Sequence, residues 1–215
     1  MEQQPHRKIC WLDLETTGLN EYKNDIVQAG MIIEIDGHQV AGKTWDMAPR
    51  SDAVLDAKAL EIIGKTEGVL RGYRPAPVVQ EEIKNFLTQY VDPYNAGDKL
   101  IIGGYNARTF DVPHWRALWQ KHDPKPEYYG SFFRSNVCLD VLSLIEELTA
   151  VGIIELGKSL KLVDVCKAMR IELGEDAHDA GADIQATYQI WKTRLEPLLA
   201  KITESPAYSR EAWYV

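Results

Sequence analysis

The sequence predicts an α/β fold, with a mixed β-sheet and α-helices on its faces. Three apolar stretches separated by short turns open the chain, which is the pattern of an antiparallel meander. After residue 56, apolar side chains at helical spacing alternate with two short apolar runs, which is the pattern of strands joined by helices. At 215 residues and with an ordinary apolar content, the chain has the size of one domain with a sizeable core.

The three opening stretches predict three consecutive strands. The first is the apolar run over residues 9–13, the second covers Asp25 to Ile35, and the third covers about His38 to Met47. The dipeptide Asp36-Gly37 lies between the second and third stretches and is a strong signal for a two-residue hairpin turn. The three strands are therefore expected to pair antiparallel.

The rest of the chain predicts helices, two short strands and the loops between them. Helices are expected at Asp56–Ile63, over Val79–Tyr90, from about Asp111, after Val141 through Leu148, at Ser159–Met169, and from about Asp179 until Pro197 ends or kinks the last one. The short strands are expected at Leu100–Ile102 and Val137–Val141, and the connecting segments at Arg71–Pro77, Asp92–Asp98 and Pro124–Ser135.

Charge and hydropathy exclude several classes of protein. The net charge of −8 argues against a protein that coats nucleic acid, which would be basic, but it allows an enzyme that grips a few nucleotides at one end. No stretch of eighteen apolar residues is present, so no membrane span is expected, and the polar N-terminus has no signal-peptide core.

The cysteines point to a reducing compartment. Cys10, Cys138 and Cys166 are far apart, and each lies in an apolar run. Buried thiols fit this distribution better than a disulfide framework or a zinc site. The chain is therefore expected to be cytoplasmic.

Two carboxylates at the end of the first strand indicate a cation site. Asp13 and Glu15 are two residues apart, so in a strand their side chains point to the same face. Carboxylates held side by side repel each other and attract a divalent cation. The alternative is a strand that simply ends in solvated acids.

Two later segments carry further acids. Asp111 follows a short buried strand and lies near a helix N-terminus, where it could equally be a helix cap. Asn106, just before it, suits a turn that its backbone hydrogen bonds lock. Asp179 and Asp183 are four residues apart on one face of the last helix, and His178 precedes them. Taken alone, this histidine could also be an ordinary surface residue.

Together, the three segments resemble the three motifs of the DEDDh (DnaQ-like) group of 3′-5′ exonucleases, the family of the polymerase III proofreading subunit. The segment from Asp13 to Gly18 is similar to the first motif, Asn106 to Asp111 to the second, and His178 to Asp183 to the third. The resemblance covers the chain from Lys8 to about Leu198. Three motifs in the family's order make the resemblance specific.

The resemblance implies a fold and a domain organisation. The family fold is RNase H-like, with a five-stranded mixed sheet whose first three strands are antiparallel and with helices on both sides. Residues 1–200 would then form the exonuclease domain, and residues 201–215 a C-terminal tail that packs back, docks a partner or is disordered.

The resemblance also implies a reaction. Asp13, Glu15, Asp111 and Asp183 would bind two divalent ions, Mg²⁺ or Mn²⁺, and His178 would act as the general base that takes a proton from the attacking water. Nucleoside 5′-monophosphates would be released from the 3′ end of single-stranded DNA.

Five further residues are expected at the substrate, and three basic ones near it. The resemblance implies that Leu19 lies against the terminal base, although Leu19 could also be a partly buried turn leucine. The other four expected at the substrate are Thr16, Thr17, Gly18 and Asn106. Lys65, Arg108 and Lys158 either contact phosphate or are solvated surface charges. No long basic groove is visible, which predicts a footprint of a few nucleotides.

Two other functions stay open. An RNA-directed exonuclease of the same group would carry the same motifs, because they do not report contacts to the 2′-hydroxyl. The Thr-Thr-Gly form of the first motif is more similar to proofreading-type members, which favours DNA. A non-catalytic nucleic-acid-binding subunit would normally have lost a metal carboxylate, and none is missing here. A polymerase or other protein partner is possible in this family, but the sequence does not identify one.

Overall fold

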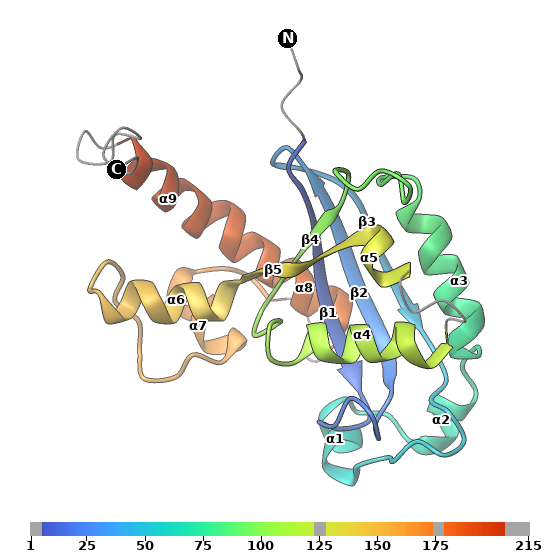
Figure 1. The fold of residues 1–215 in the computed structure, drawn as a ribbon. Coiled ribbons are helices and arrows are strands. Elements are labelled where there is room, and N and C mark those ends of the chain that lie inside the picture. Colours follow the sequence, from blue (N-terminus) through green and yellow to red (C-terminus); the bar gives the residue numbers. More distant parts are fainter. Residues whose placement is uncertain (1–5, 123–127, 174–178, 205–215) are drawn as a thin grey trace.

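The structure, a computed structural model, describes residues 6–122, 128–173 and 179–204 (Figure 1). A five-stranded sheet in the order β3-β2-β1-β4-β5 forms its centre. The strands are β1 (Lys8–Thr16), β2 (Ile26–Ile35), β3 (His38–Asp46), β4 (Leu100–Gly104) and β5 (Phe133–Asp140). The first three pair antiparallel, whereas β4 runs parallel to β1 and β5 parallel to β4, which confirms the predicted mixed sheet.

Helices cover both faces of this sheet (Figure 1). Their bounds are α1 (Ala57–Ile62), α2 (Glu67–Arg71), α3 (Ala76–Leu87), α4 (Asp111–His122), α5 (Tyr128–Phe132), α6 (Val141–Ala150), α7 (Leu162–Met169), α8 (Ala180–Ile190), the π-helical turn η1 (Trp191–Leu195) and α9 (Glu196–Thr203). Among the described residues, no helix is long and apolar enough to cross a membrane.

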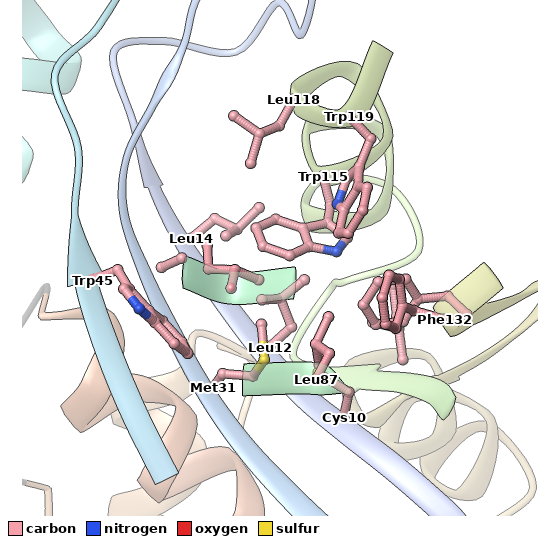
Figure 2. Close-up of a cluster of buried hydrophobic side chains, with 14 of the residues drawn as sticks. Cys10, Leu12, Leu14, Met31, Trp45, Leu87, Trp115, Leu118, Trp119 and Phe132 are labelled. Atoms are coloured by element: carbon pink, nitrogen blue, oxygen red, sulfur yellow. The ribbon is translucent and has the colours of Figure 1, made fainter. Parts of the chain in front are cut away.

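Alternation along β1 divides the core into two layers. Cys10, Leu12 and Leu14 are buried on the side of α3, α4 and α5 (Figure 2). Trp11 lies on the other side, where its ring is 5.8 Å from the ring centroids of both Tyr188 and Trp191. Because side chains alternate along a strand, residues 13 and 15 share the face of Trp11, so the two acids face helix α8.

The predicted hairpin between β2 and β3 is present. Asp36 and Gly37 have φ values of 49° and 84°, so both central residues are left-handed, as a type I′ turn requires. Asp56 caps α1 by accepting hydrogen bonds from the backbone N–H groups of Lys58 and Ala59. The expected strand and helix starts at these positions are confirmed.

Two of the predicted connecting segments contain regular structure instead. The segment Arg71–Pro77 overlaps the end of α2 and the start of α3, because a proline fits the first turn of a helix, where its missing N–H is not needed. The segment Pro124–Ser135 was expected to be irregular, but its described part holds α5 and the start of β5. Its aromatic residues are the reason, since Tyr129, Phe132 and Phe133 are buried in the core.

The last helices also differ from the prediction. Helix α7 begins at Leu162, three residues after the expected start at Ser159. Pro197 does not end the C-terminal helix, because it lies in the first turn of α9, directly after the π-helical turn η1. The division into a domain at residues 1–200 and a tail at 201–215 stays a prediction.

The cysteines match the expectation of free thiols. Cys10 and Cys166 are buried, Cys138 is half-buried, and none of the three forms a disulfide.

Candidate metal centre

Three of the predicted acids meet at one point of the structure. Asp13 and Glu15 come from β1, and Asp183 comes from the first turn of α8. One carboxylate oxygen from each of these residues lies within 4.8 Å of the other two. This spacing places hard oxygen ligands close enough to share a cation.

Asp111 approaches this cluster from a third element. It is the first residue of α4 and is only 2% exposed. Hydrogen bonds from its own backbone and from the backbone of Leu14 favour its ionised form, although burial raises its pKa well above the usual range. After burial, the charge of Asp111 contributes most to the raised pKa of Asp13. The four predicted acids therefore form one electrostatic group.

Two residues of β2 hold helix α8 against the acids of β1. Gly30 lies opposite Asp13 in the antiparallel pair, and a Cβ at this position would be 2.2 Å from the carbonyl oxygen of Ala180. Gln28 lies opposite Glu15, and its buried side-chain oxygen accepts a hydrogen bond of 2.8 Å from the backbone N–H of Ala180. The start of α8 is thereby fixed where Asp183 can meet the cluster.

Asp179 serves as the N-cap of α8. Its carboxylate accepts hydrogen bonds from the backbone N–H groups of Gly181 (2.9 Å) and Ala182 (3.1 Å). Its charge still raises the pKa of Glu15, so it lies near the cluster without being one of its three closest members. The structure therefore separates the roles of Asp179 and Asp183, which the sequence left ambiguous.

Asp140 anchors the turn that precedes Asp111. It is 4% exposed, and its two carboxylate oxygens accept hydrogen bonds from the backbone N–H groups of Asn106 (3.1 Å), Arg108 (2.9 Å) and Ser143 (3.2 Å). Sequence reasoning missed this residue. The available signal was an aspartate directly between a strand and a helix, which is an N-cap position.

Asn106 occupies a strained backbone position in the same turn. Its φ of 59° is left-handed, a region that asparagine tolerates better than most residues. Its side-chain oxygen accepts a hydrogen bond from the hydroxyl of Thr109. These contacts fit its expected role in locking the turn, and its contact with substrate stays a prediction.

The threonines of the first motif hold the turn after β1. The hydroxyl of Thr16 donates to the carbonyl of Gly18 (2.7 Å), and the hydroxyl of Thr17 donates to the carbonyl of Val54 (2.8 Å). Both threonines are buried, and Gly18 packs against the side chain of Asn24, where a Cβ would be 2.5 Å from the amide nitrogen. The hydroxyls therefore act within the turn, and substrate contacts by Thr16, Thr17 and Gly18 stay predictions.

The turn presents Leu19 to solvent. Its side chain is 84% exposed, so Leu19 is not the partly buried turn residue that the sequence left as an alternative.

His178, the predicted base, lies outside the described residues. Of the basic residues expected near the site, Lys65 lowers the pKa of Glu15 through its positive charge. The ammonium group of Lys65 lies 5.7 Å from the ring centroid of Tyr73. Lys158 is exposed.

The electrostatics of the cluster fit a divalent cation. Burial, and after it the charges of the neighbouring carboxylates, raise the pKa of Asp13 well above its usual range and that of Glu15 to about 8. Ionising this group without a counter-charge is therefore unfavourable. Oxygen ligands that repel one another are the donor set that Mg²⁺ or Mn²⁺ neutralises.

This arrangement predicts an inverse dependence of stability on pH for the metal-free protein. The folded state holds a proton on Glu15 between the ordinary pKa of 4.5 and about 8, whereas the unfolded chain releases it. Because the folded state binds more protons in this interval, the free energy of unfolding contributed by Glu15 falls as pH rises. We expect Mg²⁺ at about 100 times its dissociation constant to raise Tm by about 5–10 °C at pH near 8.

Scanning calorimetry at two pH values, with and without Mg²⁺, checks this expectation. The rise caused by Mg²⁺ should be smaller near pH 5.5, where protons compete for the carboxylates. The Glu15→Gln variant should show a smaller difference between the two pH values, and Glu61→Gln on the exposed surface of α1 is the matched control. An equal Mg²⁺ effect at both pH values in all three proteins would contradict the assignment.

Comparisons with known proteins identify the fold. No family model and no curated protein sequence matches the chain. Among solved structures, the zinc-bound complex of E. coli exonuclease I with single-stranded DNA matches with a TM-score of 0.75 and 24% identity over 91% of this chain and 42% of that one. Its complex with a dA16 oligonucleotide matches with a TM-score of 0.72 and 22% identity over 91% and 43% of the two chains.

Exonuclease I from Methylocaldum szegediense is similar to the same degree, with a TM-score of 0.72 and 21% identity over 91% of this chain and 42% of that one. The chain thus spans less than half the length of these neighbours. The likeness confirms the RNase H-like fold.

Proposed function

We propose that the chain is a metal-dependent 3′-5′ exonuclease of the DEDDh group that hydrolyses single-stranded DNA to nucleoside 5′-monophosphates. The observation that carries this proposal is the convergence of Asp13, Glu15 and Asp183 within 4.8 Å, with Asp111 beside them, on this fold. The solved neighbours are exonucleases, and two of them are bound to DNA, which supports the proposal that this chain is a nuclease.

The four acids would hold two divalent ions, Mg²⁺ or Mn²⁺. When bound, such ions activate a water molecule and stabilise charge on the scissile phosphate and the leaving 3′ oxygen. Asp13 and Glu15 are suited to hold them because β1 is a central strand of the sheet. Asp183 is suited because Gln28 and the Asp179 cap fix the first turn of α8.

His178 would take the proton from the attacking water. An imidazole titrates near neutral pH, so it can accept a proton there without being permanently charged. His178 directly precedes Asp179 in the sequence, and the carboxylate of Asp179 is fixed on the first turn of α8. A general base of this kind contributes about 10²- to 10⁴-fold to a rate.

Leu19 would contact the terminal base. Its exposed side chain follows a turn that the buried hydroxyls of Thr16 and Thr17 hold in place, and Gly18 lets the chain pass Asn24. An apolar side chain fixed in this way can pack on a base without any sequence preference, because every base has an apolar face.

The similarity of the first motif to proofreading-type members stays a prediction.

Nucleotide release from single strands tests the proposed function. DNA labelled at its 3′-terminal nucleotide and a matched RNA are incubated with Mg²⁺, with Mn²⁺ and with EDTA. We expect release of monophosphates from DNA that stops in EDTA and falls by about 10²-fold or more in His178→Ala. The matched control is His38→Ala, on the exposed surface of β3.

Each arm of this assay has a contradicting result. Release that persists in EDTA would exclude the metal mechanism, and equal rates for His178→Ala and His38→Ala would exclude His178 as the base. Faster release from RNA would assign the chain to the RNA-directed members of the group. A folded protein without activity on either strand would favour a non-catalytic binding role.

A further inference from the structure

A cavity lined by arginines lies outside the carboxylate cluster. It has a volume of about 340 Å³ and lies between α4 and β5. Three arginines line it, namely Arg108 before α4, Arg116 on α4 and Arg134 on β5, and none of its lining residues is acidic. We call this cavity the arginine pocket.

An irregular edge strand shapes the arginine pocket. Phe133 pairs with Leu100 and Cys138 with Ile102, so the four residues 134–137 bulge out of the ladder opposite a single residue of β4. The guanidinium of Arg116 donates a hydrogen bond to the carbonyl of Ser135, and that of Arg108 donates to the carbonyl of Cys138 at 3.3 Å. Neutral carbonyl groups therefore hold these two arginines on the pocket wall.

Among the described residues, the pocket arginines form no ion pair with a carboxylate. Elsewhere four arginines form ion pairs with carboxylates, namely Arg7, Arg50, Arg71 and Arg74. In a chain of net charge −8, three guanidinium groups that line one cavity without an ion pair to any described residue form a local site for anions.

The chemistry of the pocket suits phosphate. A guanidinium presents several N–H donors in a planar fork that matches phosphate oxygens. Arg116 also lies 5.3 Å from the ring centroid of Tyr129, which limits its side-chain motion, and Arg134 is exposed on the bulge. The pocket thus combines arginines held on its wall with an accessible cation on the bulge.

The arginine pocket and the carboxylate cluster share one turn. Arg108 is three residues before Asp111, which limits the separation of their Cα atoms to about 11 Å. Asp140 fixes this turn by accepting a hydrogen bond from the backbone N–H of Arg108. A strand whose end lies at the cluster is therefore within reach of Arg108 on the pocket wall.

We propose that the arginine pocket binds the phosphodiester backbone of the single strand whose 3′ end lies at the carboxylate cluster. This inference rests on the proposed function and extends it, because it makes the footprint longer than the few nucleotides predicted from the sequence. A positively charged groove along the backbone is how proteins hold single strands without reading their sequence. Negative charge elsewhere on the chain then directs the strand to this one path.

Binding in EDTA tests the pocket without any hydrolysis. Fluorescence anisotropy is measured with the full chain and a DNA strand of about 12 nucleotides labelled at its 5′ end. We expect Arg134→Gln to weaken binding about 3- to 10-fold and to reduce the slope of log affinity against log salt by about 0.7, the value for one lost phosphate contact. Lys201→Gln is the matched control, because it removes one charge from the exposed surface of α9.

Arg134→Gln should fold normally, since the side chain is exposed and forms no hydrogen bond or ion pair within the described ranges. A binding loss no larger than that of Lys201→Gln would overturn the proposal. So would a glutamate-rich peptide that competes as well as DNA and depends equally on Arg134, because the pocket would then be a site for an acidic protein. Binding that depends on Arg134 in a protein without nuclease activity would support the pocket and contradict only the proposed function.

Discussion

Asp13→Asn is expected to lower the rate of nucleotide release by about 10³-fold or more and to raise the Tm of the metal-free protein. The amide cannot supply the negative oxygen that a hard cation prefers, so about 4 kcal/mol or more of transition-state stabilisation would be lost. The same substitution removes one charge from a group of carboxylates whose pKa values are all raised. Function and stability should therefore change in opposite directions.

A lower rate together with a higher Tm is a stricter test than a loss of activity alone. We expect Tm in EDTA to rise by about 2–4 °C, the change that 1 kcal/mol produces in a domain of this size. Asp52→Asn, which alters an aspartate whose side chain is 75% exposed, should leave both quantities near the wild-type values. A variant that lost activity because it unfolded would show a lower Tm, and that result would count against the charge-cluster interpretation.

The opening strand and its acids could be predicted because the relevant information is local. A strand alternates its side chains, so Asp13 and Glu15 share a face whatever surrounds them. The residues that assemble the site are different. Gln28 and Gly30 act on Ala180, about 150 residues further along the chain, and no pattern near either residue signals that contact.

The arginine pocket could not be predicted from the sequence either, because the residues that form it are far apart along the chain. Arg108, Arg116 and Arg134 come from a turn, a helix and a strand, and in the sequence each one is typical of a solvated surface charge. Only the packing of α4 beside the bulged edge strand brings them together. A segment of aromatic residues before Ser135 was likewise predicted to be a loop, because the core that buries Phe133 consists of distant residues.

Gly30→Ala is expected to lower the rate about 10²-fold and the free energy of unfolding by about 1–3 kcal/mol. The new Cβ would lie 2.2 Å from the carbonyl oxygen of Ala180, and a backbone atom cannot move aside as a flexible side chain can. To restore normal contact, the start of α8 must retreat from the sheet by about 1 Å. Because Asp183 lies in that turn, it would move away from Asp13, and a displacement of this size costs about 10²-fold in rate.

Gly42→Ala provides the control for this substitution. Gly42 lies on the neighbouring strand β3, and the nearest atom to its added Cβ would be 3.5 Å away, an ordinary van der Waals contact. Its stability should change by no more than about 0.5 kcal/mol, and its activity should not change. Urea unfolding and nucleotide release measure both variants. If Gly30→Ala were as stable and as active as Gly42→Ala, close packing of α8 on β2 would not be what brings Asp183 to the acids of β1, and the Gln28 hydrogen bond would have to be sufficient alone.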